Sequence, residues 1–436
     1  MATITRNIVD KVKSALIKWV WEVDNKKLGS HAAIILFSTV FFVHITYSAF
    51  ESKATDFYSF YTGADLLINN RQNLYNPEVQ YTRQRQLFNE KLKNEMGFMA
   101  YVTPPLGAVL HIPFLLFQPS YAEIAAHSIS LIIILFAIYR LYRFHRIKFL
   151  SWTTVFVSSF YPIYASVHLA QIGALIFWVM VEMYIAFAQK KSVKLGLLSS
   201  LLILKYQYLP FIILIYAIYE DKRKFILSSF VGLFILTFLN SLLITKDHII
   251  QYIFSLKDYV AVPNSFGMAY KYGLDIYSVI SELSGGLNSP FQSLFIIFTI
   301  ALITQFIIAF LLIKRKDKYY HGSYIYYFCL LICLILTPHT MPADFIILII
   351  PMMGLLTKSR KPWFYVFTVL TFNLYFYFSV FGWQWTHTLL LILYLPILAI
   401  ISTKKIRGWW RILKRGVREE KILVGDPGIE PGTARV

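Results

Sequence analysis

The chain has 436 residues, of which 57% are hydrophobic and 15% are charged, and its formal net charge is +19. Soluble domains carry roughly 25% charged residues, so the composition excludes an ordinary soluble domain and indicates a polytopic membrane protein. Nucleic acid is not expected as a partner, because most of the basic residues lie in short segments between apolar runs. The positive-inside rule assigns these segments to the cytoplasmic face. They are residues 6–27, 140–148, 190–194, 222–224, 314–318, 358–361 and the tail from 404.

Residues 1–30 are expected to form a cytoplasmic amphipathic anchor. Ile8, Val12, Leu16, Trp19 and Val20 share one helical stripe, which is typical of a helix lying on the membrane surface. We find no small-residue cleavage site after a short apolar core, so a cleavable signal peptide is not expected. Residues 31–50 are long enough to cross a bilayer and are interpreted as a retained first span.

The first extracytoplasmic loop is predicted at residues 51–120. Two short helices should flank a break at Asn76-Pro77. Thr103-Pro104-Pro105 then opens an apolar segment that ends near residue 117, which is short for a span. If this segment crossed the membrane, the basic cluster at 140–148 would lie outside, so we expect a re-entrant or interfacial helix.

The remaining apolar runs alternate in direction. Single spans are predicted at residues 121–142, 150–167, 172–187, 225–243, 291–313, 324–336, 345–356, 363–380 and 388–402. Residues 195–219 lie between two basic loops, so we expect two half-helices that enter and return, broken around Lys205 and Pro210. A proline and a charge at membrane depth are tolerated only where they line a cavity or pack on protein.

The predicted fold class is an all-α polytopic membrane protein with about 12 transmembrane segments, including the re-entrant pair, and two extracytoplasmic loops. The second loop is predicted at 245–290 and the membrane domain at 31–403. The tail at 404–436 is basic and then Gly/Pro-rich, and we expect it to be disordered. Both termini should be cytoplasmic in a multi-pass protein of the plasma membrane. Cys329 and Cys333 are four residues apart in one predicted helix, a poor geometry for a disulfide, so we expect packing roles.

Polar residues at the extracytoplasmic helix ends are the candidates for chemistry. Asp56 follows the first span, where partial burial and the negative end of that helix would both raise its pKa. Lys205 lies in the deep break, and a buried lysine without a partner is costly. The other candidates are Asp65, Tyr101, His168, Gln171, His339 and Asp344.

Each candidate also has a structural interpretation. Asp56 could solvate or cap a loop, and Asp65 could be a solvated loop residue or a helix-surface carboxylate. His168 and Gln171 could bond backbone groups at a helix turn. Three further polar residues are interpreted as isolated and structural, namely Glu182, Asn240 and His127.

A carboxylate at the rim of an outward-open cavity, with cations behind it, suits the displacement of a phosphate by a hydroxyl. A general base takes the hydroxyl proton, and cations stabilise charge on the leaving phosphate. The sequence has no Gly-rich phosphate loop and no His/Cys cluster with metal-ligand spacing. A cytoplasmic nucleotide-sugar site is therefore unsupported, and neither a metal nor another cofactor is expected.

From Asp56-Phe57 onward the chain resembles a known family. Asp56-Phe57, Tyr61, Ala64, Leu67 and Asn73-Leu74-Tyr75-Asn76-Pro77 resemble the first loop of the polyprenol-phosphate-mannose-dependent α-1,2-mannosyltransferases, a family within the glycosyltransferase-C superfamily. That family includes the enzyme that elongates phosphatidylinositol mannosides. The similarity covers about residues 31–400. It continues through Tyr101-Val102-Thr103-Pro104-Pro105-Leu106, Pro113, Gln171, Gly196, Lys205, Thr337-Pro338-His339-Thr340 and Asp344, and departs at Ala170, where the family usually has Gly.

The resemblance implies an inverting transferase with its site on the extracytoplasmic face. The donor would be a hexose, expected to be mannose, on polyprenyl monophosphate, and the acceptor a lipid-linked or cell-envelope glycan. The family's base matches Asp56 and its late histidine matches His339. Lys205 and His339 would meet the donor phosphate, and His168, Gln171 and Tyr101 would complete the donor site, with Asp65 and Asp344 as secondary candidates. Membrane lipids would surround the polyprenyl tail.

Two other functions remain open. A lipid or polysaccharide flippase would use Asp56 and Lys205 as a gate, but many transporters contain an internal repeat and we find none. An envelope polysaccharide polymerase would be expected to carry Arg-rich outer loops, whereas residues 51–100 balance six basic against six acidic residues.

Overall fold

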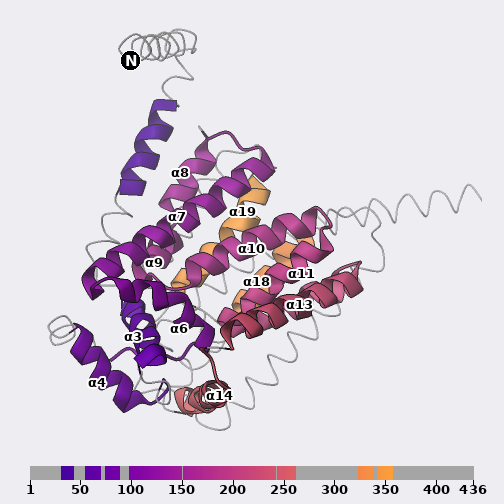
Figure 1. The fold of residues 1–436 in the computed structure, drawn as a ribbon. Helices are drawn as coiled ribbons and strands as arrows, with labels where there is room; N and C mark the ends of the chain where they lie inside the picture. Colours follow the sequence, from indigo (N-terminus) through magenta and orange to yellow (C-terminus); the bar gives the residue numbers. More distant parts are fainter. Residues whose placement is uncertain are drawn as a thin grey trace, which may run out of the picture. The chain divides into compact units, whose positions relative to one another are not determined.

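A computed structural model describes residues 31–43, 55–69, 74–88, 98–149, 151–241, 243–261, 323–336 and 341–356 (Figure 1). These residues belong to one compact unit, Met1–Thr386. The described elements are all helices, which confirms the predicted all-α class. Several predictions fall outside the described residues and stay predictions. They are the anchor at 1–30, the spans at 291–313, 363–380 and 388–402, the tail at 404–436, and the total number of spans.

The described elements follow one another without a strand, and η denotes a 3-10 helix. A helix at His31–Val43 comes first. The others are α3 (Thr55–Asn69), α4 (Pro77–Phe88), α6 (Pro105–His111), η2 (Ile112–Leu116), α7 (Pro119–His145), α8 (Trp152–Ser159), α9 (Tyr161–Leu169), α10 (Gly173–Ala188), α11 (Ser192–Ser200), η3 (Leu201–Tyr208), α12 (Leu209–Ile218), α13 (Lys222–Asn240), α14 (Lys246–Ala261), α18 (Ser323–Leu336), η4 (Pro342–Leu348) and α19 (Ile349–Leu356).

Two described helices, α7 and α13, are long and apolar enough to cross a membrane. Along α13, Leu227, Phe230, Phe234 and Phe238 are 67%, 66%, 70% and 66% exposed, and their spacing places them on one stripe. Proteins in water rarely leave so many large apolar side chains uncovered on one surface. The stripe therefore fits a helix whose outer side faces lipid.

The predicted break in the first loop is confirmed at Asn76-Pro77. The Asn76 side-chain oxygen accepts hydrogen bonds from the backbone N–H groups of Glu78 (3.0 Å) and Val79 (3.2 Å), so it caps α4. Pro77 opens the helix, where its missing N–H costs nothing. The apolar segment after Pro104 is also helical, as α6 and η2. Its depth relative to the membrane stays a prediction.

The predicted single span at 150–167 is wrong as a continuous helix. The segment is divided into α8 and α9 at Phe160, whose backbone is extended (φ −75°, ψ 108°). Pro162 lies in the first turn of α9, where its ring and missing N–H prevent the helical hydrogen bonds from continuing through this point.

The predicted break at Lys205 is confirmed. Lys205 has non-helical backbone angles (φ −138°, ψ 82°) inside η3, between α11 and α12. The two flanking helices have different main neighbours, because α11 packs on α13 and α10 while α12 packs on α18. The contact of α11 with α13 is close: a Cβ at Gly196 would lie 2.0 Å from Ser228 Oγ and 2.3 Å from Phe225 O.

Helix α10 lies at the centre of these contacts and packs on α7, α11, α18 and η4. Glu182 on α10 accepts hydrogen bonds from Arg140 Nε of α7 and Lys194 Nζ of α11, both at 2.5 Å. The interpretation of Glu182 as isolated is therefore wrong, since it joins three helices. Cys329 and Cys333 are buried thiols, which fits the expected packing roles.

Candidate active site

Asp56 lies in the first turn of α3, on a helix that is held in place by its aromatic residues. Phe57, Tyr58, Phe60 and Tyr61 are almost fully buried, so the start of α3 is fixed on several sides. Tyr61 donates its hydroxyl to Phe117 O (3.1 Å), which ties α3 to the end of η2. Asp56 itself is only partly buried, so its carboxylate keeps access to a reactant.

The electrostatic environment of Asp56 suits a general base. Burial raises the pKa of Asp56 from 3.8 to about 6, the positive charge of Lys205 lowers it, and the negative charge of Asp344 raises it. The expected influence of the preceding helix stays a prediction, because the residues between Val43 and Thr55 lie outside the described part of the chain. Asp56 lies at the N-terminal end of α3. The dipole of α3 favours the ionised form, and burial outweighs it.

Lys205 and Asp344 form a buried ion pair. The Lys205 ammonium donates a hydrogen bond to Asp344 Oδ1, and the two side chains are only 12% and 2% exposed. This pairing explains how a lysine is tolerated in an apolar segment, because a buried cation needs a nearby anion. Both charges act on Asp56, so three predicted site residues, Asp56, Lys205 and Asp344, lie within electrostatic reach of one another.

Three further donors fix the Asp344 carboxylate. Gln207 Nε2 (3.2 Å) and the Tyr208 hydroxyl (3.2 Å) reach it from η3, and Met341 N (3.0 Å) reaches it from its own helical turn. A buried carboxylate with this many donors is fixed in position. Asp344 therefore holds the Lys205 ammonium in place through a network that joins η3 to η4.

The turn between α9 and α10 lies beside these residues. Ala170 has a left-handed backbone (φ 45°) and packs in one cluster with Phe57 and Tyr58, the residues that follow Asp56. Ser166 Oγ of α9 donates to Ala343 O (2.9 Å), next to Asp344. The turn therefore carries His168 and Gln171 close to α3 and η4. His168 stacks on Tyr164, with the two rings 5.6 Å apart and parallel within 1°.

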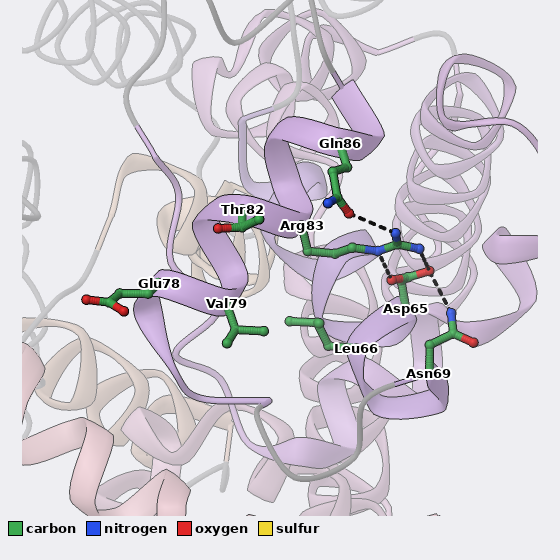
Figure 2. Close-up of a pocket in the computed structure, with 8 residues that line it drawn as sticks. All are labelled: Asp65, Leu66, Asn69, Glu78, Val79, Thr82, Arg83 and Gln86. Atoms are coloured by element: carbon green, nitrogen blue, oxygen red, sulfur yellow. Dashed lines mark hydrogen bonds and ion pairs between the residues drawn. The ribbon is translucent and has the colours of Figure 1, made fainter.

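Two other predicted residues have well-defined structural contacts. Tyr101 is 1% exposed, donates its hydroxyl to Pro104 O (2.7 Å), and packs edge-on against Phe60. Asp65 is paired with Arg83 of α4 rather than solvated (Figure 2). A role for either residue in donor binding stays a prediction. His339 lies outside the described residues.

The partners of Asp344 were not identified from the sequence. Gln207 and Tyr208 lie two and three residues after Lys205, and a polar pair in the middle of an apolar run is a signal that could have marked them. The pairing of Lys205 with Asp344 joins residues 139 positions apart, and single-sequence patterns give no such contact. Among the described residues, no three His, Cys, Asp or Glu side chains form a group that could hold a metal ion. The expectation that no metal is required stays a prediction.

Two long apolar helices, an exposed apolar stripe on α13 and a buried ion pair fit an integral membrane protein. A comparison with known families identifies the chain more closely. Residues 101–338, more than half of the chain, match the family model described as Glycosyltransferase family 87, and the chain belongs to this family. It is a membrane glycosyltransferase.

The matched region contains His168, Gln171 and Lys205, begins after Asp56, and ends just before His339. No curated protein and no solved structure matches the chain. The family supports the transferase interpretation over the flippase, because a flippase moves its substrate without covalent change. The sequence motifs predict a narrower family, the α-1,2-mannosyltransferases.

Proposed function

We propose that this transferase moves a hexose, specifically mannose, from a polyprenyl-phosphate sugar to a lipid-linked or cell-envelope glycan. The reaction would take place on the extracytoplasmic face with inversion at the anomeric carbon. The observation that carries the proposal is a partly buried carboxylate, Asp56, with a pKa raised to about 6 and lying within electrostatic reach of the Lys205–Asp344 pair. A base with a pKa near the working pH is well suited to proton abstraction.

The chemistry follows from these charges. Asp56 accepts the proton of the acceptor hydroxyl, whose oxygen attacks the anomeric carbon. The bond from that carbon to the phosphate oxygen breaks, and polyprenyl phosphate leaves with the bonding electrons. The Lys205 ammonium stabilises the phosphate charge as it develops. Lysine has three N–H donors and Asp344 takes one, so donors remain for the phosphate.

His339 and the turn that carries His168 and Gln171 complete the proposed donor site. The polyprenyl tail would lie between helices in lipid, beside the phosphate. A monophosphate leaving group can be stabilised by side-chain cations, so no obligatory metal is proposed. The assignment to the α-1,2-mannosyltransferase family rests on the motifs from Asp56 to Asp344, together with the match to family 87.

The test is the transfer of radiolabelled mannose from a polyprenyl-phosphate donor in membranes. The variant Asp56→Asn keeps the shape of the side chain but cannot accept the proton, so we expect transfer to fall by about 10²–10⁴-fold. Wild-type activity should survive EDTA. Normal transfer by a well-folded Asp56→Asn protein would refute the base assignment, and loss of wild-type transfer in EDTA would refute the metal-free mechanism.

A further inference from the structure

A polar cleft lies between α3 and α4 (Figure 2). Asp56, Lys205 and Asp344 are not among the residues that line it. It is open to the outside and has a volume of about 510 Å³, within the range of small-ligand sites. The catalytic proposal uses none of the side chains that line it. Because the cleft lies in the predicted first extracytoplasmic loop, it would face the compartment in which the acceptor is found.

One wall of the cleft is fixed by hydrogen bonds before any ligand arrives. Asp65, only 7% exposed, accepts hydrogen bonds from Arg83 through both Nε (2.6 Å) and Nη2 (2.9 Å), and from Asn69 Nδ2 (2.9 Å). Arg83 Nη1 also donates to Gln86 Oε1 (3.1 Å), as Figure 2 shows. Groups that are already ordered lose little entropy when a ligand binds, so this wall is preorganised.

The charges of the cleft select the kind of ligand. The cation of Arg83 is already paired with Asp65, and Glu78 adds a further negative charge at the rim, so an anionic headgroup is disfavoured. Leu66 and Val79 supply apolar surface between the polar groups. Planar amide, guanidinium and carboxylate groups beside small apolar patches suit a neutral ligand with hydroxyl edges and C–H faces. That description fits a carbohydrate.

Because the cleft and Asp56 lie on opposite sides of α3, the cleft would bind a part of the glycan that is distant from the reacting hydroxyl. Asp65 follows Asp56 by nine residues on α3, which is about 13.5 Å along the helix axis and about half a turn around it. The two carboxylates therefore project from opposite sides of α3. A short acceptor that reaches Asp56 does not extend to the cleft, whereas a long glycan can pass around α3 to reach it.

The geometry points to a second carbohydrate-binding site in the cleft between α3 and α4, which holds a distal, uncharged segment of a long glycan acceptor. This inference rests on the proposed function in taking a glycan as the acceptor. It adds the prediction that acceptor length matters, because binding at the cleft raises the affinity for long acceptors and leaves the chemistry at Asp56 unchanged.

The test compares two octyl glycosides as acceptors, one with a single mannose and one with a long mannose oligosaccharide. Thr82 is exposed and lines the cleft, so Thr82→Trp fills the cleft without removing the Asp65–Arg83 pair. Arg85 is exposed on the same helix and does not line the cleft, so Arg85→Trp is the matched control. We expect Thr82→Trp to raise KM for the long acceptor about tenfold, while its kcat and the KM for the short acceptor stay unchanged.

Two kinetic results would overturn the inference. One is an unchanged KM of Thr82→Trp for the long acceptor, and the other is an equal loss of kcat/KM for both acceptors. If the wild-type protein transfers mannose to neither acceptor, the proposed function fails, and the cleft is tested separately by saturation-transfer NMR with the long glycoside. Binding to the wild type and to Arg85→Trp but not to Thr82→Trp would support the site. Equal binding by all three proteins, or no binding by any of them, would exclude the site.

Discussion

The pH dependence of transfer should report the ionisation of Asp56. With a pKa of about 6 this carboxyl is about 91% ionised at about pH 7 and about 9% ionised at about pH 5, so kcat/KM should fall about tenfold between them. A carboxyl with the ordinary value of 3.8 would be more than about 90% ionised at both, and the two rates would nearly match. The ratio of the two rates therefore distinguishes a buried base from a solvated one.

The variant Asp344→Asn tests the source of this shift. The negative charge of Asp344 raises the pKa of Asp56, and its loss also leaves the Lys205 charge uncompensated, which lowers the same pKa. Both effects move the acid limb of the profile to lower pH. We expect the fall in kcat/KM between about pH 7 and about pH 5 to become smaller than in the wild type but not to disappear, because burial, the largest cause of the raised pKa, remains. The absolute rate should also fall, because Lys205 is less firmly held.

Tyr208→Phe is the matched control. It removes one donor to Asp344 but no charge, so the acid limb should stay near pH 6. The measurement is the initial rate of mannose transfer in detergent, over a range of pH and at donor concentrations below KM, which gives kcat/KM of the free enzyme. An acid limb near pH 4 in the wild type, or one that Asp344→Asn leaves unmoved, would refute the electrostatic account of Asp56.

Three further predictions concern stability, each measured by thermal unfolding in detergent. Asp56 has a folded-state pKa above its ordinary value, so the folded state loses stability as the pH rises from about 4 to about 6, and the full cost is present above about pH 6. At about pH 7, Asp56→Asn should raise the free energy of unfolding by on the order of 3 kcal/mol, and below about pH 4 it should leave that free energy unchanged. Equal stability of the variant and the wild type at about pH 7 would contradict the buried environment of Asp56. Gly196→Ala should lower stability, because its Cβ would meet Ser228 Oγ at 2.0 Å, whereas Gly173→Ala, with nothing nearer than 3.7 Å, should be tolerated. Equal losses of stability in Gly196→Ala and Gly173→Ala would contradict the close packing of α11 on α13. Ala170→Val should cost more than about 2 kcal/mol, because a β-branched residue suits neither the left-handed backbone nor the buried cluster, and Ala170→Gly should stay within about 1 kcal/mol of the wild type. Equal stabilities of the two variants would contradict that backbone conformation.

Local chemistry made several helix boundaries predictable. Asn76-Pro77 is a strong start signal for a helix, since Asn caps and Pro fits the first position, and α4 begins there. The interruption at Lys205 was predictable because a charge at membrane depth requires a special environment. The interruption at Phe160 was missed, since apolar residues on both sides of Pro162 gave the segment the appearance of a continuous span.

The candidate site was predictable as a set of residue types but not as a set of contacts. Asp56, Lys205 and Asp344 were selected as polar residues where apolar ones are expected, and the structure brings them within electrostatic reach of one another. The pairing of Lys205 with Asp344 depends on how α10, η3 and η4 pack, which no local pattern encodes. The pairing of Asp65 with Arg83 likewise depends on how α4 folds back onto α3.

The left-handed backbone of Ala170 gives a physical reason for the main departure from the motif of the family that the sequence resembles. The position adopts φ 45°, which glycine tolerates at no steric cost and alanine at a small one. The methyl group of Ala170 packs in the buried cluster around Phe57 and Tyr58, which offsets part of that cost. An alanine can therefore replace glycine here without changing the turn.

The four hydrogen bonds to Asp344 have a mechanical consequence. One carboxylate is bonded both to residues of η3 and to the backbone of Met341, so the interior kink and the start of the late helix share a single anchor. A shift of η4 must carry the ammonium of Lys205 with it, and neither segment can relax alone without breaking a bond. In the proposed mechanism, the donor phosphate would thus meet a cation whose position was set during folding, and little rearrangement would remain for the moment of reaction.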